Sequence, residues 1–373
     1  MKLKMAKKRL FLNNAETQMG DDTYDTSAAA PDAGPAAAPR KRSVVAPHAF
    51  AATINIPSTG TVLCNRYELL EEIGRGAMGV VFKALDKSLD NNVAIKILPP
   101  ELANSKKAIA NLKQEAKLAM KLRHPSIMGL HNFEDSDVCK FLVMELLQGE
   151  TLEEYLLREE KAPLPVSLDL ARYLGEALDY AHFEKVIHRD IKPANIFYDQ
   201  RNQFIRPRLT DFGIARQMRE SMSRLTHQDV SGTLLYMSPE QLQGEDIDGR
   251  ADVYSLAATI YEMMAGHPPF YRGDISYQII NKAPPPIDKD LYPEAQKVLF
   301  KALAKDPNER WPNGRTFAAH LIQTALTYFH AEYELAPVQE MVPGLAQQLA
   351  PKVKLWMANK GPRRLYDYPE DED

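Results

Sequence analysis

The chain has 373 residues, of which 45% are hydrophobic, and its formal net charge is −4. So small a charge on so long a chain gives no argument for a nucleic-acid partner. The two cysteines, Cys64 and Cys139, are too few and too far apart in sequence for a disulfide framework or a metal cluster, which indicates a reducing, cytoplasmic setting. No run of about 18 apolar residues without a charge is present, so the sequence predicts no membrane span.

Residues 1–60 are predicted to form a disordered tail. Basic residues crowd the first nine positions, but no apolar stretch of signal-peptide length follows them. This pattern favours a solvated tail over a targeting signal. Residues 28–39 consist almost entirely of Ala and Pro, and such a segment buries too little apolar surface to fold.

A strand-rich region is predicted to begin near residue 67. Short apolar or β-branched runs separated by Gly, Asp and Asn indicate strands, here over residues 67–73, 80–85 and 92–98. Residues 105–122 change to a helical period, and Pro125 prevents that helix from continuing. Two more strands are expected, at residues 129–133 and 140–146.

A helix-rich region follows from residue 151. Long helical patterns cover residues 165–184, 250–265, 293–304 and 314–330. Strands followed by helices predict an α+β fold in two lobes with a cleft between them, an N-lobe at 67–147 and a C-lobe at 148–325. Residues 145–150 would connect the lobes. Residues 331–373 are predicted to form a C-terminal extension that ends in an acidic tail.

Three glycines, Gly74, Gly76 and Gly79, lie between two predicted strands. Glycines permit a tight turn and let backbone N–H groups come close to phosphate. Dinucleotide-binding domains use the same spacing, but there the glycines open a helix. Because residues 80–84 continue as a strand, that alternative is disfavoured. On the motif alone, a phosphate-binding loop and an ordinary glycine hairpin both stay open.

A lysine within an apolar strand, Lys96, must place its charge against a partner. A phosphate together with a carboxylate would satisfy it, and Glu115 borders the packed face of the next predicted helix. The alternative is a lysine that faces solvent from an edge strand. The glycine loop just before it favours the phosphate role.

Residues 188–195 read His-Arg-Asp-Ile-Lys-Pro-Ala-Asn. Asp190 could accept a proton from an attacking hydroxyl, and Lys192 could reach a phosphoryl group. Asn195 supplies a neutral oxygen and Asp211 a charged one, both suited to Mg²⁺. Each motif alone could be a loop or a turn. Together, behind a glycine loop and a buried lysine, they predict phosphoryl transfer.

This set of motifs resembles the eukaryotic-like Ser/Thr protein kinases, including those of bacteria, over residues 67–325. The resemblance implies a bilobal protein kinase fold that uses ATP and Mg²⁺. It also implies that Asp190 is the catalytic base with Lys192 beside it, that Asn195 and Asp211 bind the metal, and that Lys96 pairs with Glu115. The residues that would cover the ATP phosphates are Ile73, Gly74, Arg75, Gly76, Ala77, Met78, Gly79, Val80 and Val81.

The resemblance also assigns an adenine pocket. Met144 would lie at its back, and Glu145 and Leu147 would offer backbone groups to the base. The ring would be held between three apolar side chains, those of Ala94, Val81 and Phe197.

Control features follow from the same resemblance. Glu240 is expected to pair with Arg310, and Asp252 to hold the catalytic loop. Arg189 is expected to bind a phosphate on the activation segment, residues 211–240, after autophosphorylation through a transient homodimer. Thr226 is the preferred acceptor and Ser223 the second; Ser221 and Ser231 are further candidates, whereas Thr233 would position the substrate.

The substrates implied are proteins that carry Ser or Thr acceptors, because residues 192–195 lack the Arg-containing variant of Tyr kinases. Two alternatives remain beside an active kinase. One is a catalytically weak, kinase-like scaffold, which the retention of Lys96, Asp190, Asn195 and Asp211 disfavours. The other is a small-molecule phosphotransferase, which the peptide platform expected at 211–240 disfavours. The Arg-rich segment 201–208 is expected to lengthen a hairpin in the C-lobe.

Overall fold

A computed structural model describes residues 57–76, 79–136, 138–200, 205–212, 234–287 and 293–333, with side chains described up to residue 325. The chain divides into Met1–Ala52 and Thr53–Asp373, and all described residues belong to the second unit. Several predicted features therefore lie outside the described residues. They are the tail before residue 57, Ala77 and Met78, most of the C-terminal extension, and the activation-segment residues Ser221, Ser223, Thr226, Ser231 and Thr233.

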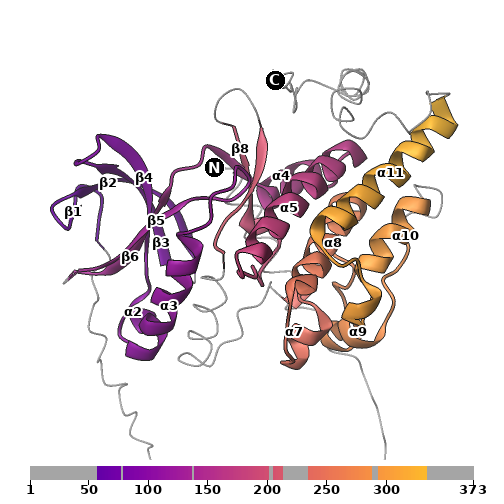
Figure 1. Ribbon diagram of the computed structural model, residues 1–373. Coiled ribbons are helices and arrows are strands. Elements are labelled where there is room, and N and C mark those ends of the chain that lie inside the picture. The colour runs from indigo at the N-terminus through magenta and orange to yellow at the C-terminus, as the bar shows by residue number, and fades with distance from the viewer. Residues whose placement is uncertain are drawn as a thin grey trace, which may run out of the picture. The chain divides into compact units, whose positions relative to one another are not determined.

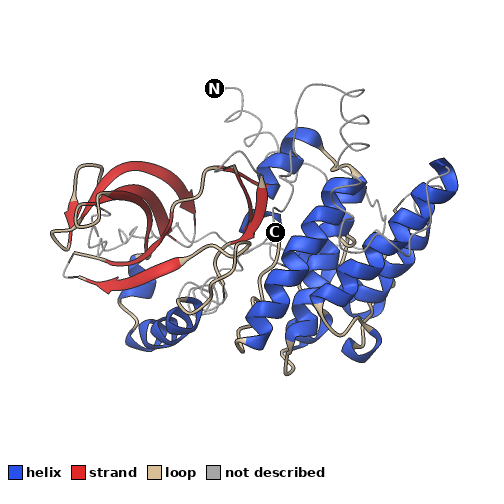
Figure 2. Ribbon diagram, turned by 45° about the horizontal axis from the view of Figure 1, so that its top comes forward, coloured by secondary structure: helices blue, strands red, loops and turns tan. Residues whose placement is uncertain are grey.

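A six-stranded antiparallel sheet forms the first part of the fold (Figure 1). Its strands run in the order β1-β2-β3-β4-β6-β5 and curl around their own core (Figure 2). The strands are β1 (Val62–Leu63), β2 (Tyr67–Gly76), β3 (Gly79–Asp86), β4 (Asn91–Ile97), β5 (Leu130–Asp135) and β6 (Lys140–Glu145). The predicted strands are confirmed, and β1 adds a short strand before residue 67 that pairs with the start of β2.

The curl of this sheet follows from where its apolar side chains point. In β3 the buried residues Val80, Phe82 and Ala84 alternate with more exposed ones, as expected for a strand with one face in a core. The rings of Tyr67 on β2 and Phe141 on β6 meet edge to face at 5.9 Å, although β3 and β4 lie between their strands. The sheet thus encloses an apolar cluster of its own.

Two helices connect β4 to β5. The short α2 (Pro100–Ala103) has Pro at its first position, where no backbone N–H is needed. The longer α3 (Lys106–Ala119) begins at Ser105, whose hydroxyl accepts a hydrogen bond from the N–H of Ala108. Its buried stripe includes Leu112 and Ala116. The predicted helix over 105–122 is confirmed, although it ends three residues earlier.

The second part of the fold is mainly helical. Its helices are α4 (Leu152–Glu159), α5 (Leu164–Phe183), α7 (Pro239–Gln243), α8 (Gly249–Ala265), α9 (Ile275–Asn281), α10 (Pro293–Ala302) and α11 (Gly314–Tyr333). The four predicted helices correspond to α5, α8, α10 and α11, whereas α4, α7 and α9 were not predicted. These three are short, so each offers few turns from which a helical period can be recognised.

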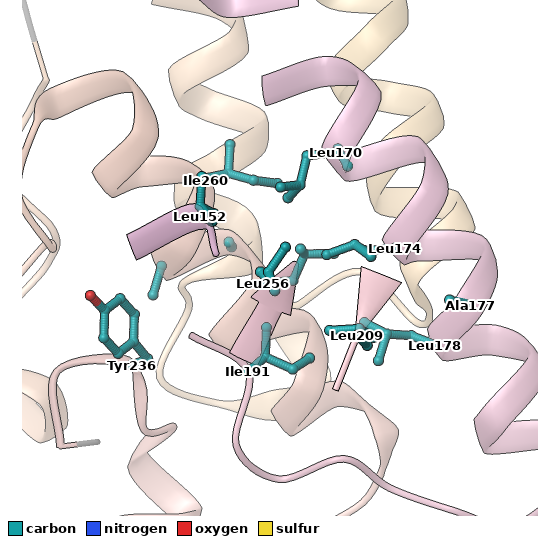
Figure 3. Packing of buried hydrophobic residues seen from close by; sticks show 14 of the residues in the cluster. Leu152, Leu170, Leu174, Ala177, Leu178, Ile191, Leu209, Tyr236, Leu256 and Ile260 are labelled. Carbon is teal, nitrogen blue, oxygen red and sulfur yellow. The ribbon is translucent and has the colours of Figure 1, made fainter. Parts of the chain in front are cut away.

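The core of the helical part lies between α5 and α8 (Figure 3). Leu170, Leu174 and Leu178 of α5 are fully buried, as are Leu256 and Ile260 of α8. The same cluster includes two residues from the loop-rich middle of the chain, Ile191 and Leu209 (Figure 3). Apolar packing therefore fixes the segments on which the proposed catalytic residues lie.

A close contact between two glycines joins α5 to α11. A Cβ on Gly175 would lie only 2.6 Å from the carbonyl oxygen of Gly314. Because neither residue has a side chain, the two helices can approach at this point.

A small second sheet lies beside the helices, with the order β7-β8-β9. Its strands are β7 (Gly149–Thr151), β8 (Ile196–Asp199) and β9 (Arg206–Leu209). The hairpin of β8 and β9 agrees with the hairpin predicted around residues 201–208. Three single turns of 3₁₀ helix complete the described elements: η1 (Pro193–Asn195), η3 (Leu234–Tyr236) and η4 (Pro307–Glu309).

The architecture is α+β, as predicted, with a curled strand-rich part followed by a helical part. The last described helix extends to Tyr333, beyond the predicted end of the C-lobe at residue 325. None of the helices in the described ranges is both long enough and apolar enough to cross a bilayer.

Candidate active site

Lys96 on β4 is 6% exposed, and its ammonium group has a charged partner. Its Nζ lies 2.8 Å from Oδ2 of Asp211, a residue 115 positions later in the chain. Burial acts to raise the pKa of the Asp211 carboxyl, but the Lys96 ammonium, with smaller contributions from His188 and Lys192, holds that pKa below its ordinary value. Asp211 is therefore held as a carboxylate, the form that can bind a cation.

The expected pair of Lys96 and Glu115 is not formed. Glu115 is half-buried on α3, and among the described residues no hydrogen bond or ion pair joins it to Lys96. The Lys96 ammonium instead lies at hydrogen-bond distance from Asp211, which packing brings beside β4. The prediction placed the right lysine in a buried strand but gave it the wrong carboxylate.

Asp190 is 3% exposed and lies at the centre of the loop that carries residues 188–195. Nδ2 of Asn195 donates to Oδ2 of Asp190 at 2.7 Å and to its backbone carbonyl at 2.8 Å. Nζ of Lys192 lies 3.3 Å from the same Oδ2. The three side chains that the motif predicted to act together are thus in direct contact.

The buried carboxylate of Asp252, near the start of α8, anchors this loop. Its Oδ2 accepts the backbone N–H of His188 and its Oδ1 that of Arg189, both at 2.8 Å. His182 lies against the same carboxylate, with Nε2 2.8 Å from Oδ2. Burial acts to raise the pKa of Asp252, but the hydrogen bond and charge of His182, together with His188 and the backbone N–H of Arg189, lower that pKa below its usual value. The predicted role of Asp252 is confirmed.

The anchored loop has strained backbone. Arg189 has a φ of 67° and Asp211 a φ of 60°, values that are uncommon for residues other than glycine. Arg189 directly precedes Asp190 in this loop, and Asp211 is the proposed metal ligand beside it. Strain of this kind persists only where the surrounding contacts hold it.

Hydrogen bonds also connect the catalytic loop to the segment before Asp211. The imidazole Nε2 of His188 lies 2.9 Å from the carbonyl oxygen of Thr210, and its ring meets that of Phe212 edge to face at 4.5 Å. The N–H of Thr210 donates to the carbonyl of Asn195 at 3.0 Å. Asp190, Asn195, Asp211 and Lys96 therefore form one connected assembly.

The donors of Asn195 and Asp211 suit Mg²⁺. Asn195 uses its amide nitrogen to bind Asp190, which leaves its carbonyl oxygen for other partners, and Asp211 has a second carboxylate oxygen besides the one on Lys96. Oxygen ligands of this kind, few from the protein and the rest from phosphates and water, are what Mg²⁺ commonly takes. Within the described residues, no group of three or more His, Cys, Asp or Glu could hold a metal ion.

The glycine run is a hairpin between β2 and β3, as the strand pattern predicted. Gly76 and Gly79 face each other across the register, and Gly74 faces Val81. Gly79 has a φ of 115°, and a Cβ there would collide with the carbonyl oxygen of Ile97. Ile73 and Arg75 are exposed on the same hairpin. An exposed glycine hairpin is compatible with both readings of this motif, a phosphate cover and an ordinary turn.

Four of the residues assigned to the adenine pocket lie on three neighbouring strands, β3, β4 and β6. Ala94 faces Met144 across the β4–β6 register, and Val81 faces Lys96 across β3–β4. Phe197 is half-buried on β8. The backbone N–H of Glu145 already donates to the carbonyl of Gly129 at 2.8 Å, so only the carbonyl of Glu145 can be offered to a base.

A buried ion pair fixes the segment that follows the activation segment. Arg310 donates two hydrogen bonds to the carboxylate of Glu240, each 2.7 Å long. The side chain of Gln241 reaches back to the carbonyl of Arg189 at 3.1 Å. The predicted pair of Glu240 and Arg310 is confirmed, and Gln241 ties this segment to the catalytic loop.

Sequence reasoning missed Arg208. Its guanidinium is buried on β9 and binds the carboxylate of Glu145, for which only a backbone role was predicted. A signal was present, because an arginine within a predicted strand needs a buried anionic partner. The sequence offered many carboxylates and no means of choosing among them.

A surface pocket of about 420 Å³ lies elsewhere, lined by residues that include His182, Phe183, Asp248 and Arg250. One of its lining residues, His182, contacts Asp252.

Comparison with known proteins agrees with the fold. The family model for the protein kinase domain matches residues 67–325. The serine/threonine-protein kinase PknA of Mycobacterium tuberculosis is 35% identical over 271 residues, which are 70% of this chain and 62% of that protein. PknB of Mycolicibacterium smegmatis is also 35% identical, over 70% of this chain and 43% of its own length. The chain thus spans less than two thirds of the length of these relatives.

Solved structures of bacterial kinase domains are also similar to this chain. The crystal structure of the PknI kinase domain of Mycobacterium tuberculosis matches with a TM-score of 0.60 and 28% sequence identity. The match covers 72% of this chain and 99% of that domain. This chain therefore belongs to the protein kinase family. Its similarity within that family is to bacterial serine/threonine-protein kinases, as the motifs predicted.

Proposed function

We propose that this chain is an ATP- and Mg²⁺-dependent protein kinase that transfers the γ-phosphate of ATP to Ser or Thr hydroxyls of proteins. The observation that carries the proposal is the connected assembly of Lys96, Asp211, Asn195 and Asp190, drawn from distant parts of the chain. Phosphoryl transfer needs positioned groups and compensation of negative charge, and this assembly supplies both.

Each residue of the assembly has a role in this proposal. Asp190 accepts the proton of the attacking hydroxyl, and Lys192, 3.3 Å from it, brings a positive charge to the transferred phosphoryl group. Lys96 contributes its ammonium to the ATP phosphates from beside Asp211. Asn195 and Asp211 would hold Mg²⁺, which neutralises charge on the phosphates.

The glycine hairpin and the adenine pocket complete the nucleotide site. The exposed hairpin of Ile73, Gly74, Arg75, Gly76 and Gly79, together with Ala77 and Met78, would cover the phosphates. Ala94, Val81 and Phe197 would hold the base, with Met144 behind it and Glu145 and Leu147 at its edge. The Glu145 carbonyl is the one backbone group of that residue suited to the task, because its N–H is bound to Gly129.

One experiment tests the proposal. Purified protein is incubated with labelled ATP, Mg²⁺ and a generic basic protein, beside the variant Asp190→Asn. The wild type should label Ser and Thr residues, and the variant should lose at least about a hundredfold in rate. Equal labelling by both proteins would contradict the mechanism. Nucleotide binding by the wild type without any labelling would favour the scaffold alternative.

Control by phosphorylation is the second element of the proposal. Nε of Arg189 is buried, and within the described residues it has no hydrogen-bond partner. A phosphate on the activation segment would supply one, through autophosphorylation in a transient homodimer, with Thr226 as the preferred acceptor. Phosphosite mapping of the fully active protein tests this. An activation segment without phosphate between residues 221 and 231 would contradict it.

We also propose that the protein acts in the cytoplasm on protein substrates rather than on nucleic acid. Neither Cys64 nor Cys139 forms a disulfide, which suits a reducing compartment. Fractionation of cells that produce the full-length protein tests the location.

A further inference from the structure

Arg208 lies at the centre of a buried cluster of charges. Its side chain is 10% exposed, and that of Asp199, its partner on β8, is 7% exposed. Nη1 of Arg208 donates to Oε1 of Glu145 at 2.8 Å and to Oδ2 of Asp199 at 3.0 Å. Nη2 donates to Oε2 of Glu145 at 2.6 Å and to the carbonyl oxygen of Ile127 at 2.8 Å. One guanidinium thus holds two carboxylates and a backbone carbonyl.

The cluster also fixes the backbone on both sides of Glu145. The N–H of Gly129 donates to Oε2 of Glu145 at 2.9 Å, and the N–H of Glu145 donates to the carbonyl of Gly129 at 2.8 Å. Two hydrogen bonds hold Gln148. Its N–H donates to Oδ1 of Asp199, the last residue of β8, and its carbonyl accepts the N–H of Gln200 at 2.7 Å. The connector of residues 145–148 therefore rests on the Arg208 cluster at its start and on β8 at its end.

The strand that carries Arg208 leads directly to the proposed metal ligand. Leu209 donates to the carbonyl of Ser126 at 2.9 Å and accepts the N–H of Met128 at 2.8 Å. Asp211 follows two residues later, in contact with Lys96. Arg208 therefore lies between the residue proposed to face adenine and the residues proposed to bind the phosphates and the metal.

The chemistry of the cluster requires arginine. A guanidinium presents several N–H groups in a fixed plane and can serve two carboxylates and a carbonyl at once, whereas an ammonium is a compact point charge. Removal of the guanidinium would leave Glu145 and Asp199, two negative charges in a poorly hydrated place, to repel each other. Glu145 would then leave its place and take the connector with it.

We propose that Arg208 is a positioning residue for the nucleotide: it holds the connector of residues 145–148 in the shape that presents the Glu145 carbonyl and the Leu147 backbone to adenine. This inference rests on the proposed function. It adds that affinity for the base depends on a side chain that does not touch the nucleotide.

Measuring the binding of adenosine and of ATP to the purified full-length protein distinguishes a role at the base from a role at the phosphates. Arg208→Met should weaken the affinity for both ligands by the same factor, about fivefold or more, because the change acts at the base that they share. Arg208→Lys should restore only part of the loss, since it returns a charge without the planar fork. Lys96→Met, measured in parallel, should weaken ATP but not adenosine, because it acts on the phosphates.

Two further variants keep the test decisive if Arg208→Met is too unstable to study. Glu145→Gln preserves the shape of the side chain but removes its charge, and it should weaken adenosine in the same direction. Arg66→Met removes another bidentate pair, with Asp86 at the end of β3, and should leave both affinities unchanged although it also destabilises the protein.

The outcomes are distinct. Wild-type affinity for adenosine in folded Arg208→Met or Glu145→Gln would overturn the inference, and so would an equal loss in Arg66→Met. A faster turnover in Arg208→Met with unchanged adenosine affinity would also overturn it, because the cluster would then restrain movement rather than position the base. The proposed function fails independently, if Asp190→Asn labels protein as fast as the wild type.

Discussion

Lys96 and Asp211 form the ion pair that joins the curled sheet to the proposed metal site, with 2.8 Å between Nζ and Oδ2. The pair makes the two residues dependent on each other. The ammonium keeps the Asp211 carboxyl ionised despite its burial, and the carboxylate satisfies a lysine that is almost inaccessible to water.

The first prediction concerns this lysine. Lys96→Met should lower kcat/KM for phosphoryl transfer by at least about a hundredfold, because it removes a charge that compensates the phosphates and lets the pKa of Asp211 rise. Steady-state kinetics at saturating Mg²⁺ measures the loss. Lys87→Met is the matched control, since Lys87 also forms an ion pair, with Glu68, but on the exposed surface. Similar losses in both variants would contradict the assignment.

The second prediction concerns the anchor of the catalytic loop. Asp252→Asn places an amide group where a carboxylate accepts the N–H groups of His188 and Arg189 and contacts His182. We expect a loss of about 2–4 kcal/mol in the free energy of unfolding and a fall in kcat that exceeds any change in KM for ATP. Urea unfolding and steady-state kinetics measure the two effects. Asp248→Asn, at the exposed N-cap of the same helix, should change neither by much.

The third prediction concerns pH. Burial raises the pKa of the Glu262 carboxyl to about 7, and the nearby charge of Glu153 adds to the rise, while a hydrogen bond from the Tyr236 hydroxyl opposes it. The folded protein therefore keeps a proton on Glu262 that the unfolded chain releases near pH 4.5. Stability from this group is complete below pH 4.5, falls as the pH rises to about 7, and stays constant above that.

Glu262→Gln should remove this slope. When the pH is raised from 5 to 8, the wild type should lose about 2 kcal/mol of its free energy of unfolding through Glu262, and the variant should not show this loss. Denaturant titrations of both proteins at the two pH values measure the difference. An unchanged slope in the variant would show that Glu262 titrates normally in the folded protein.

The fourth prediction concerns the buried pair of Glu240 and Arg310. Arg310→Met should destabilise the protein by about 3–5 kcal/mol, because it leaves the Glu240 carboxylate buried without a cation. The double variant Glu240→Gln/Arg310→Met should lose less than the sum of the two single changes, since no unpaired charge remains. Urea unfolding of the four proteins gives the coupling. Additive losses would indicate that the two side chains act separately.

Much of the site could be predicted from local sequence. Residues 188–195 form one continuous loop, so Asp190, Lys192 and Asn195 are close in space because they are close in the chain. The glycine hairpin was predictable for the same reason, because β2 and β3 are adjacent strands. The helices α5 and α8 were predicted because a long apolar stripe repeats over many turns.

Contacts between distant segments could not be predicted in the same way. Lys96 was expected to pair with Glu115, but Asp211 is the carboxylate at hydrogen-bond distance. Arg208 was seen only as part of a lengthened hairpin, although it binds Glu145, 63 residues earlier. In both cases the sequence contains several carboxylates of similar chemistry, and only packing determines which one is near.

The sequence by itself determined the family, the α+β architecture and the chemical groups of the proposed site, because motifs and periodicity are local properties of the chain. The tertiary structure decided the partners of Lys96 and Arg208, because a buried charge binds the opposite charge that packing brings within about 3 Å, wherever that residue lies in the chain.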